Sequence, residues 1–205
     1  MRKLVCSLAL ALVAGAPAFA GQATTAPTVP TVPNVIGDVR AAIAKGDFAL
    51  GESILERFRA EHGTTSQALE ALSWLGRGAL AADALDKAYD YALRTEDLVR
   101  EALQKNSNLD VDRWVPIALG ASFEVQAQVL GRKNRTSEAI YLLENAKQEF
   151  KDTSIITRLQ KNVLLLTLEG KPAPALEFAE QIGPRPPTLA ELKGKTVLVF
   201  FWAHW

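Results

Sequence analysis

The sequence is poor in the residues that most often carry chemistry in proteins. It has one cysteine, one methionine and two histidines among 205 residues. Cys6 lies near the N-terminus, so the rest of the chain can form no disulfide, bind no metal through sulfur and use no thiol nucleophile. With only His62 and His204 as histidines, no metal site is predicted, and we expect no cofactor.

An excess of charge of either sign is absent too. The chain has 23 basic and 23 acidic residues, which gives no formal net charge. Proteins that bind nucleic acid through its phosphates carry clustered lysine and arginine, so we expect no nucleic-acid partner. The 48% hydrophobic and 22% charged composition is that of a globular protein, with enough chain for one sizeable core or two small ones.

The first twenty residues have the pattern of a secretory signal peptide. Arg2 and Lys3 precede an apolar run, and Ala18-Phe19-Ala20 has the small-x-small pattern of a cleavage site. We therefore predict a signal peptide over residues 1–20 and export of the mature protein. The run is too short for a comfortable membrane span, so we expect no span after cleavage. An uncleaved anchor, which would make the protein a membrane-tethered scaffold, is the alternative.

Proline-rich sequence follows the predicted signal. Residues 21–34 contain Pro27, Pro30 and Pro33 among threonine, alanine and valine. Prolines at this spacing favour an extended polyproline II conformation and exclude a helix interior. We interpret residues 21–34 as a linker.

Residues 35–168 have the apolar periodicity of seven helices. Gly46-Asp47 is expected to end the first helix, and His62-Gly63 the second. We expect Asp152 or Thr153 to cap the seventh. Gly76-Arg77-Gly78 imitates part of a dinucleotide-binding motif, but helical periodicity runs through it. We therefore expect these glycines to allow close helix packing.

Small residues recur at similar places in the predicted helices. Gly51 lies five residues after Gly46, and Ala139 lies five residues after Asn134. This pattern resembles that of the tetratricopeptide repeat (TPR), with its aromatic, glycine and proline positions only partly filled. The resemblance implies stacked antiparallel helical hairpins over residues 35–168, and a surface on which a partner protein or peptide binds. A generic helical bundle is the alternative.

The sequence changes character at residue 169. Pro172 and Pro174 exclude a helix interior, and Thr188 and Glu191 are spaced as a capping box. The apolar run over residues 196–201 predicts a strand buried on both faces. Such a strand needs neighbours on both edges, so we expect residues 169–205 to be the truncated start of a second domain.

These residues resemble the opening of periplasmic TlpA-like disulfide reductases of the thioredoxin and redoxin superfamily. That family has Pro-Ala-Pro, then a leader ending Leu-Lys-Gly-Lys, a buried strand, and Phe-Trp-Ala-x-Trp directly before Cys-x-x-Cys. The matching parts of this chain are Lys171–Pro174, Leu192–Lys195 and Val197–Trp205. The resemblance implies a mostly α chain that ends in the first strand of an incomplete α/β thioredoxin-like domain. A peroxiredoxin is a poorer match, because its strand leads into a proline-led loop with a threonine before the cysteine.

The resemblance also implies an exported, periplasmic thiol–disulfide oxidoreductase that acts on a protein substrate or redox partner. Trp202, His204 and Trp205 would flank its active site. Both redox cysteines are expected after Trp205, so this chain contains no catalytic residue and is expected to be inactive as given. The alternative function is a non-enzymatic exported adaptor or scaffold.

Overall fold

The structure is a computed structural model that describes residues 34–168, 170–177, 180 and 182–200. Asn34 begins a compact unit separate from residues 1–33. The expected signal peptide and all of the expected linker except Asn34 lie outside the described residues. Asn34 itself caps the first helix, because its side chain accepts a hydrogen bond from the backbone N–H of Gly37.

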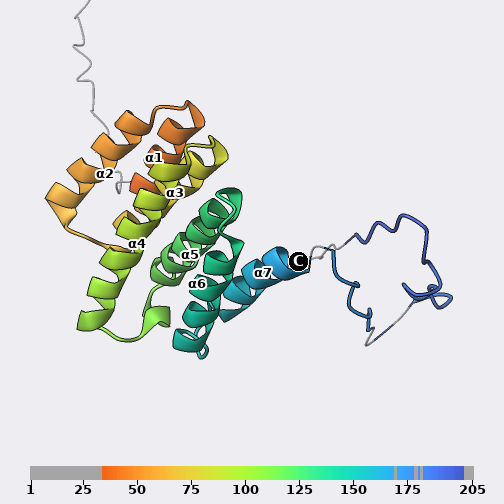
Figure 1. Cartoon of the computed structure of the whole chain (residues 1–205). Coiled ribbons are helices and arrows are strands. Elements are labelled where there is room, and N and C mark those ends of the chain that lie inside the picture. Colours follow the sequence, from red (N-terminus) through yellow and green to blue (C-terminus); the bar gives the residue numbers. More distant parts are fainter. Residues whose placement is uncertain (1–33, 169, 178–179, 181, 201–205) are drawn as a thin grey trace, which may run out of the picture. The chain divides into compact units, whose positions relative to one another are not determined.

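The described residues form seven α-helices and one short 3₁₀-helix, and they contain no strand (Figure 1). The fold is therefore mostly α, and the seven helices expected from apolar periodicity are confirmed. The elements are α1 (Val35–Ala44), α2 (Phe48–His62), α3 (Ser66–Ala81), α4 (Leu85–Lys105), η1 (Leu109–Val111), α5 (Trp114–Arg132), α6 (Thr136–Glu149) and α7 (Ile156–Thr167).

The helices follow one simple order of packing. The odd-numbered helices α1, α3, α5 and α7 pack on one another in sequence. Each even-numbered helix packs against the odd-numbered helix before it and the one after it. The chain thus runs back and forth between two layers, as the successive helices of Figure 1 show. We call the odd-numbered row the odd-helix layer.

One turn geometry recurs after the odd-numbered helices. Asp83 and Asn134, which follow α3 and α5, have positive φ angles of 58° and 59°. Gly46 after α1 and Gly170 after α7 have φ angles of 75° and 73°. These residues have left-handed backbone conformations, which end a helix and let the chain reverse. After α1, α3 and α5, the backbone N–H of the following residue donates a hydrogen bond to a carbonyl five residues earlier. Those bonds are Asp47 to Ala42 at 3.0 Å, Ala84 to Ala79 at 2.9 Å and Arg135 to Leu130 at 2.8 Å.

Small side chains allow the helices to approach closely. A Cβ atom on Gly78 would lie 2.4 Å from Cγ2 of Ile43 on α1, which is too close for a side chain. A Cβ atom on Gly76 would lie 3.5 Å from Cβ of Tyr91 on α4. The Gly76-Arg77-Gly78 segment therefore serves helix packing, as predicted.

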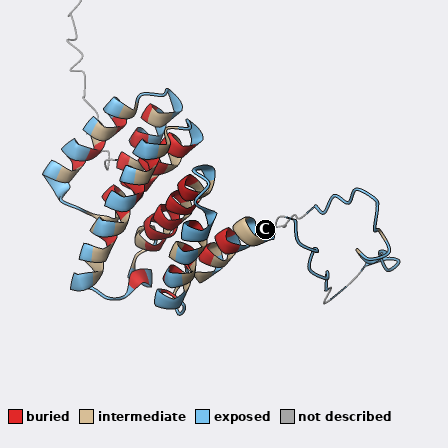
Figure 2. Ribbon diagram, in the orientation of Figure 1, coloured by how far each residue is buried: buried red, intermediate tan, exposed pale blue. Residues whose placement is uncertain are grey.

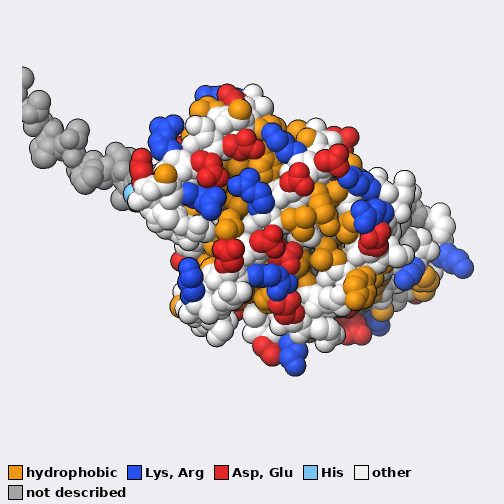
Figure 3. Space-filling model, turned by 60° about the vertical axis from the view of Figure 1, so that its left-hand side comes forward, with side chains coloured by type: hydrophobic (Ala, Val, Ile, Leu, Met, Phe, Trp, Pro, Cys, Tyr) orange, Lys and Arg blue, Asp and Glu red, His pale blue; other side chains and the backbone are white. Residues whose placement is uncertain are grey.

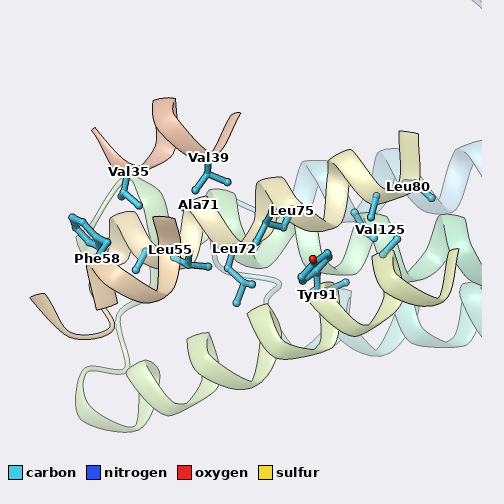
Figure 4. Packing of buried hydrophobic residues seen from close by; sticks show 14 of the residues in the cluster. Val35, Val39, Leu55, Phe58, Ala71, Leu72, Leu75, Leu80, Tyr91 and Val125 are labelled. Atoms are coloured by element: carbon cyan, nitrogen blue, oxygen red, sulfur yellow. The ribbon is translucent and has the colours of Figure 1, made fainter. Parts of the chain in front are cut away.

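The core consists of two clusters that share the central helices. The first, drawn in Figure 4, joins α1 to α4 around Leu72 and Leu75 and includes Val125 of α5. The second joins α4 to α7 around Phe123 and includes Leu69 of α3. Figure 2 shows that buried residues are concentrated along α3 and α5. Because both helices contribute to both clusters, the array is held together across its middle.

The cap predicted for α7 is wrong. The N-cap residue is Ile155, which makes no side-chain cap hydrogen bond, rather than Asp152 or Thr153. The Thr153 hydroxyl donates instead to the carbonyl of Phe150 at 2.8 Å, so it supplies a hydrogen bond to a carbonyl at the C-terminal end of α6. The cap was misplaced because the sequence does not show which of two adjacent helix ends a hydroxyl will serve.

The strand predicted over residues 196–201 is also wrong for the part that the structure describes. Residues 196–200 adopt no strand, and Leu198 and Phe200 are 92% and 80% exposed. A strand exists only through hydrogen bonds to a neighbouring strand, and no described segment supplies one. The predicted capping box is confirmed. The Thr188 N–H donates to Glu191 Oε2 at 2.7 Å, and the Glu191 N–H donates to Thr188 Oγ1 at 3.3 Å.

Candidate functional site

The three residues predicted to flank a redox site, Trp202, His204 and Trp205, lie outside the described residues. Among the described residues, no group of three or more histidine, cysteine or carboxylate side chains is placed to hold a metal ion. His62 packs on Phe58 at the end of α2, with ring centroids 4.6 Å apart. A functional surface must therefore be sought elsewhere in the helical array.

An indole lies between two guanidinium groups on the odd-helix layer. Trp74 of α3 is half-buried, and the guanidinium carbons of Arg40 and Arg77 each lie 4.2 Å from its ring centroid. Arg77 follows Trp74 by three residues and so shares its helix face. Arg40 comes from α1, which packs directly on α3. Both contacts are cation–π interactions, and they fix the orientation of the indole.

A buried carboxylate holds Arg77 in place. Glu70 is only 2% exposed, and Arg77 Nη2 donates to its two oxygens at 2.8 Å and 2.9 Å. The Ser73 hydroxyl lies 2.9 Å from Glu70 Oε2. A buried carboxylate requires such partners, because burial without them is strongly unfavourable. Burial lowers the pKa of Arg77, and Glu70 offsets this only in part.

A second charged cluster connects α5 to α7. Glu124 accepts hydrogen bonds from Arg158 Nε at 2.7 Å and from Lys161 Nζ at 3.3 Å. Burial alone would raise the pKa of Glu124, but the hydrogen bonds and positive charges of Arg158 and Lys161 lower it overall. The charges of Glu124 and Arg158 also act on the pKa of Arg77. The second cluster lies on α5 and α7, and α5 packs directly on α3.

We call these seven side chains the odd-helix ladder, since they span all four odd-numbered helices: Arg40, Glu70, Trp74, Arg77, Glu124, Arg158 and Lys161. Its cations can recognise a ligand by charge. The sequence analysis did not predict the ladder. The spacing of Glu70, Ser73 and Arg77, at positions i, i+3 and i+7, does indicate a polar face on α3. The approach of Arg40 to Trp74 depends on helix packing and left no sequence signal.

Charges of both signs are mixed on the surface of the helical array. Figure 3 shows one face of the molecule on which basic and acidic side chains are interspersed around apolar ones. Ion pairs among the described residues include Arg100 with Glu149 at 2.6 Å and Arg135 with Glu138 at 2.6 Å. This face carries no continuous basic block of the kind that binds phosphates.

The last helix presents an exposed apolar surface. Leu164 and Leu165 of α7 and Leu168, which follows the helix directly, are 40%, 65% and 38% exposed and line a shallow pocket with Ile156 and Gln160. We call Leu164, Leu165 and Leu168 the apolar row of α7. No described element packs over this row.

The chain matches no protein-family model, no curated protein and no solved structure. None of the described helices combines the length and the apolar composition needed to cross a membrane.

Proposed function

We propose that this chain is the N-terminal part of an exported, periplasmic thiol–disulfide oxidoreductase of the TlpA-like type. Residues 35–168 are its TPR-like domain, which binds a protein substrate or redox partner. Residues 169–205 begin a thioredoxin-like domain whose redox cysteines follow Trp205. The segment Phe201-Trp202-Ala203-His204-Trp205 is the observation that carries the redox part of the proposal, because the family has this pattern directly before Cys-x-x-Cys.

The recurring hairpin turn supports the TPR-like part. Helical repeats built on one turn stack into an array whose side chains line an extended binding surface. Here the turn after α1, α3 and α5 is the same, and the odd-helix layer carries the indole and charges of the ladder. The ladder is the part of this layer that is best suited to protein recognition, because tryptophan and arginine contribute strongly to protein–protein binding.

In the proposed enzyme, residues 196–201 would form a strand once the rest of the domain pairs with them, and this strand would deliver the first cysteine to the start of a helix. Unpaired N–H groups and the helix dipole there lower the pKa of a thiol. The thiolate attacks a substrate disulfide, and one substrate sulfur leaves as a thiolate while a mixed disulfide forms. The second cysteine then attacks the mixed disulfide and releases the reduced substrate. Trp202, His204 and Trp205 would shape access to this site.

The test is to read the gene past Trp205 and express the protein that it encodes without residues 1–20. If Cys-x-x-Cys follows, the extended protein should reduce insulin disulfides in the presence of dithiothreitol, and replacing both cysteines by serine should abolish the activity. The 205-residue chain, which has only Cys6, serves as the inactive control. A stop codon directly after Trp205, or an extended protein without activity, would refute the redox part.

The alternative function is a non-enzymatic exported adaptor. The described helices favour an adaptor in one respect. Both hydrophobic clusters consist of residues from the helical array alone. The adaptor becomes the better assignment if no redox cysteines follow and if partner binding depends on Trp74.

A further inference from the structure

The chain turns after α7 with the same backbone conformation that it has after α1. Gly170 has a φ angle of 73°, close to the 75° of Gly46 after α1. The backbone N–H of Lys171 then donates to the carbonyl of Leu168 at 3.0 Å, which closes the turn. After α1, α3 and α5, the helix that follows the turn packs back against the helix that precedes it. The turn at Gly170 therefore favours a return of the chain along α7.

The residues that follow this turn are apolar and cannot form a helix. Residues 172–176 read Pro-Ala-Pro-Ala-Leu, and Pro172 and Pro174 exclude a helix interior. Residues 171–176 belong to no helix or strand and are exposed, with Leu176 at 44%. We call residues 171–176 the strap. Five successive apolar residues thus come shortly after a helix whose own apolar row is exposed.

We propose that the strap folds back and covers the apolar row of α7. The pocket on α7 extends from Ile156 to Leu168 and has a volume of about 790 Å³. At about 1.5 Å per residue, this length of helix is about 18 Å. From Gly170 to Leu176 the chain spans about 19 Å in the polyproline II conformation that its prolines favour, at about 3.1 Å per residue. An extended strap is therefore as long as the pocket, with Leu176 at the Ile156 end.

Two features favour the strap over a second copy of the chain. Alanine and proline side chains lose almost no rotamer freedom on burial, and the prolines already restrict the backbone, so docking costs little entropy. The strap is also covalently joined to the end of α7, which gives it an effective concentration on the order of millimolar at the row. The contacts are few, so docking is weak and adds little to the free energy of unfolding. The inference goes beyond the proposed function, because it holds whether or not redox cysteines follow Trp205.

Disulfide formation between two introduced cysteines tests the direction of the strap. The experiment uses the 205-residue chain with Cys6→Ser, oxidised glutathione, and Glu177→Cys directly after the strap. One variant adds Thr157→Cys, which lies in the pocket, and the other adds Thr167→Cys, at the end of α7 and outside the pocket. A docked strap brings residue 177 near Thr157, so this pair should form its disulfide about threefold faster than the Thr167 pair. A free chain would favour Thr167, which is nearer in sequence.

Matched variants separate docking from differences in exposure. Each rate is divided by the reactivity of the single cysteines toward iodoacetamide. Leu165→Asp should remove the preference for Thr157, because a charge in the apolar row opposes docking. Tyr141→Asp is the control and should keep the preference, since Tyr141 is 71% exposed on α6 and lies outside the row. Circular dichroism of each variant shows whether the helices are intact.

Four outcomes would overturn the inference. Equal or faster pairing at Thr167, or a preference for Thr157 that survives Leu165→Asp, would show that the strap does not cover the row. Disulfide-linked dimers of the single Thr157→Cys variant, formed faster than the intramolecular bond, would assign the row to a second copy. Faster pairing of Thr157→Cys with Val199→Cys than with Glu177→Cys would assign it to the exposed apolar residues 197–200. None of these results bears on the insulin-reduction test.

Discussion

Helices α3 and α7 both belong to the odd-helix layer, yet α3 buries charged and polar side chains whereas α7 exposes apolar ones. Thirteen, ten and six residues before the positive-φ residue Asp83 are Glu70, Ser73 and Arg77. The same intervals before the positive-φ residue Gly170 give Thr157, Gln160 and Leu164. On α3 these positions are charged or polar, yet Glu70 and Ser73 are only 2% and 3% exposed. On α7 they include Leu164, which is 40% exposed.

The difference shows that position in the array, rather than hydrophobicity, decides burial here. Helix α5 packs over α3, whereas no described element packs over the same face of α7. The polar residues of α3 tolerate burial because they form hydrogen bonds with one another. The apolar row of α7 is exposed because no described helix follows α7 to cover it.

The largest effect expected from this comparison lies within α7 itself. Leu159 is fully buried, whereas Leu165 is 65% exposed. Leu159→Ala should lower the free energy of unfolding by about 2–5 kcal/mol, because it leaves a cavity, and Leu165→Ala by less than about 0.5 kcal/mol. Urea unfolding of the 205-residue chain, followed by circular dichroism, measures both. If the two losses are equal, the apolar row is covered in solution and the comparison fails.

A smaller effect is expected from giving α3 the residues that α7 has. Glu70→Thr leaves Arg77 without its carboxylate, and Arg77 is 22% exposed, so we expect a loss of about 1–3 kcal/mol. Adding Arg77→Leu removes the unpaired cation and should recover at least half of that loss. Urea unfolding of the single and double variants tests this. Purely additive losses would show that the pair is not coupled.

The helical part of the fold could be predicted because its signals are local. Glycine at positions 46 and 63 marked the ends of α1 and α2, and apolar periodicity marked the buried faces. The turn at Asp83 carries the same backbone geometry on a residue that is not glycine, so it escaped notice. The strand over residues 196–201 failed because strand formation depends on a partner that a local pattern cannot supply.

The candidate site was less predictable, since it depends on contacts between helices. Glu70 and Arg77 lie on one helix, and their spacing could have indicated a polar face. Arg40 and Trp74 are thirty-four residues apart in the sequence and meet only because α1 packs on α3. Contacts of this kind follow from the order of helix packing, which periodicity does not determine.

The smallest effect concerns pH and the attachment of α7. The charges of Arg158 and Lys161 lower the folded-state pKa of Glu124 below its ordinary value of 4.5. A carboxylate with a lowered folded pKa contributes stability that is present above 4.5 and is lost as the pH falls through the folded value. The thermal midpoint should therefore drop on acidification, and Glu124→Gln should make this drop smaller.

The control for this prediction is Glu144→Gln, because among the described residues Glu144 forms its ion pair with Lys147 on its own helix α6. It should keep the acid dependence of the parent chain, as measured by thermal unfolding at neutral pH and below 4.5. If Glu124→Gln keeps the full acid dependence too, the ion pairs between α5 and α7 contribute little to stability. In that case apolar packing alone holds α7 in the array. Helices α3 and α7 would then differ only in the helices that pack over them.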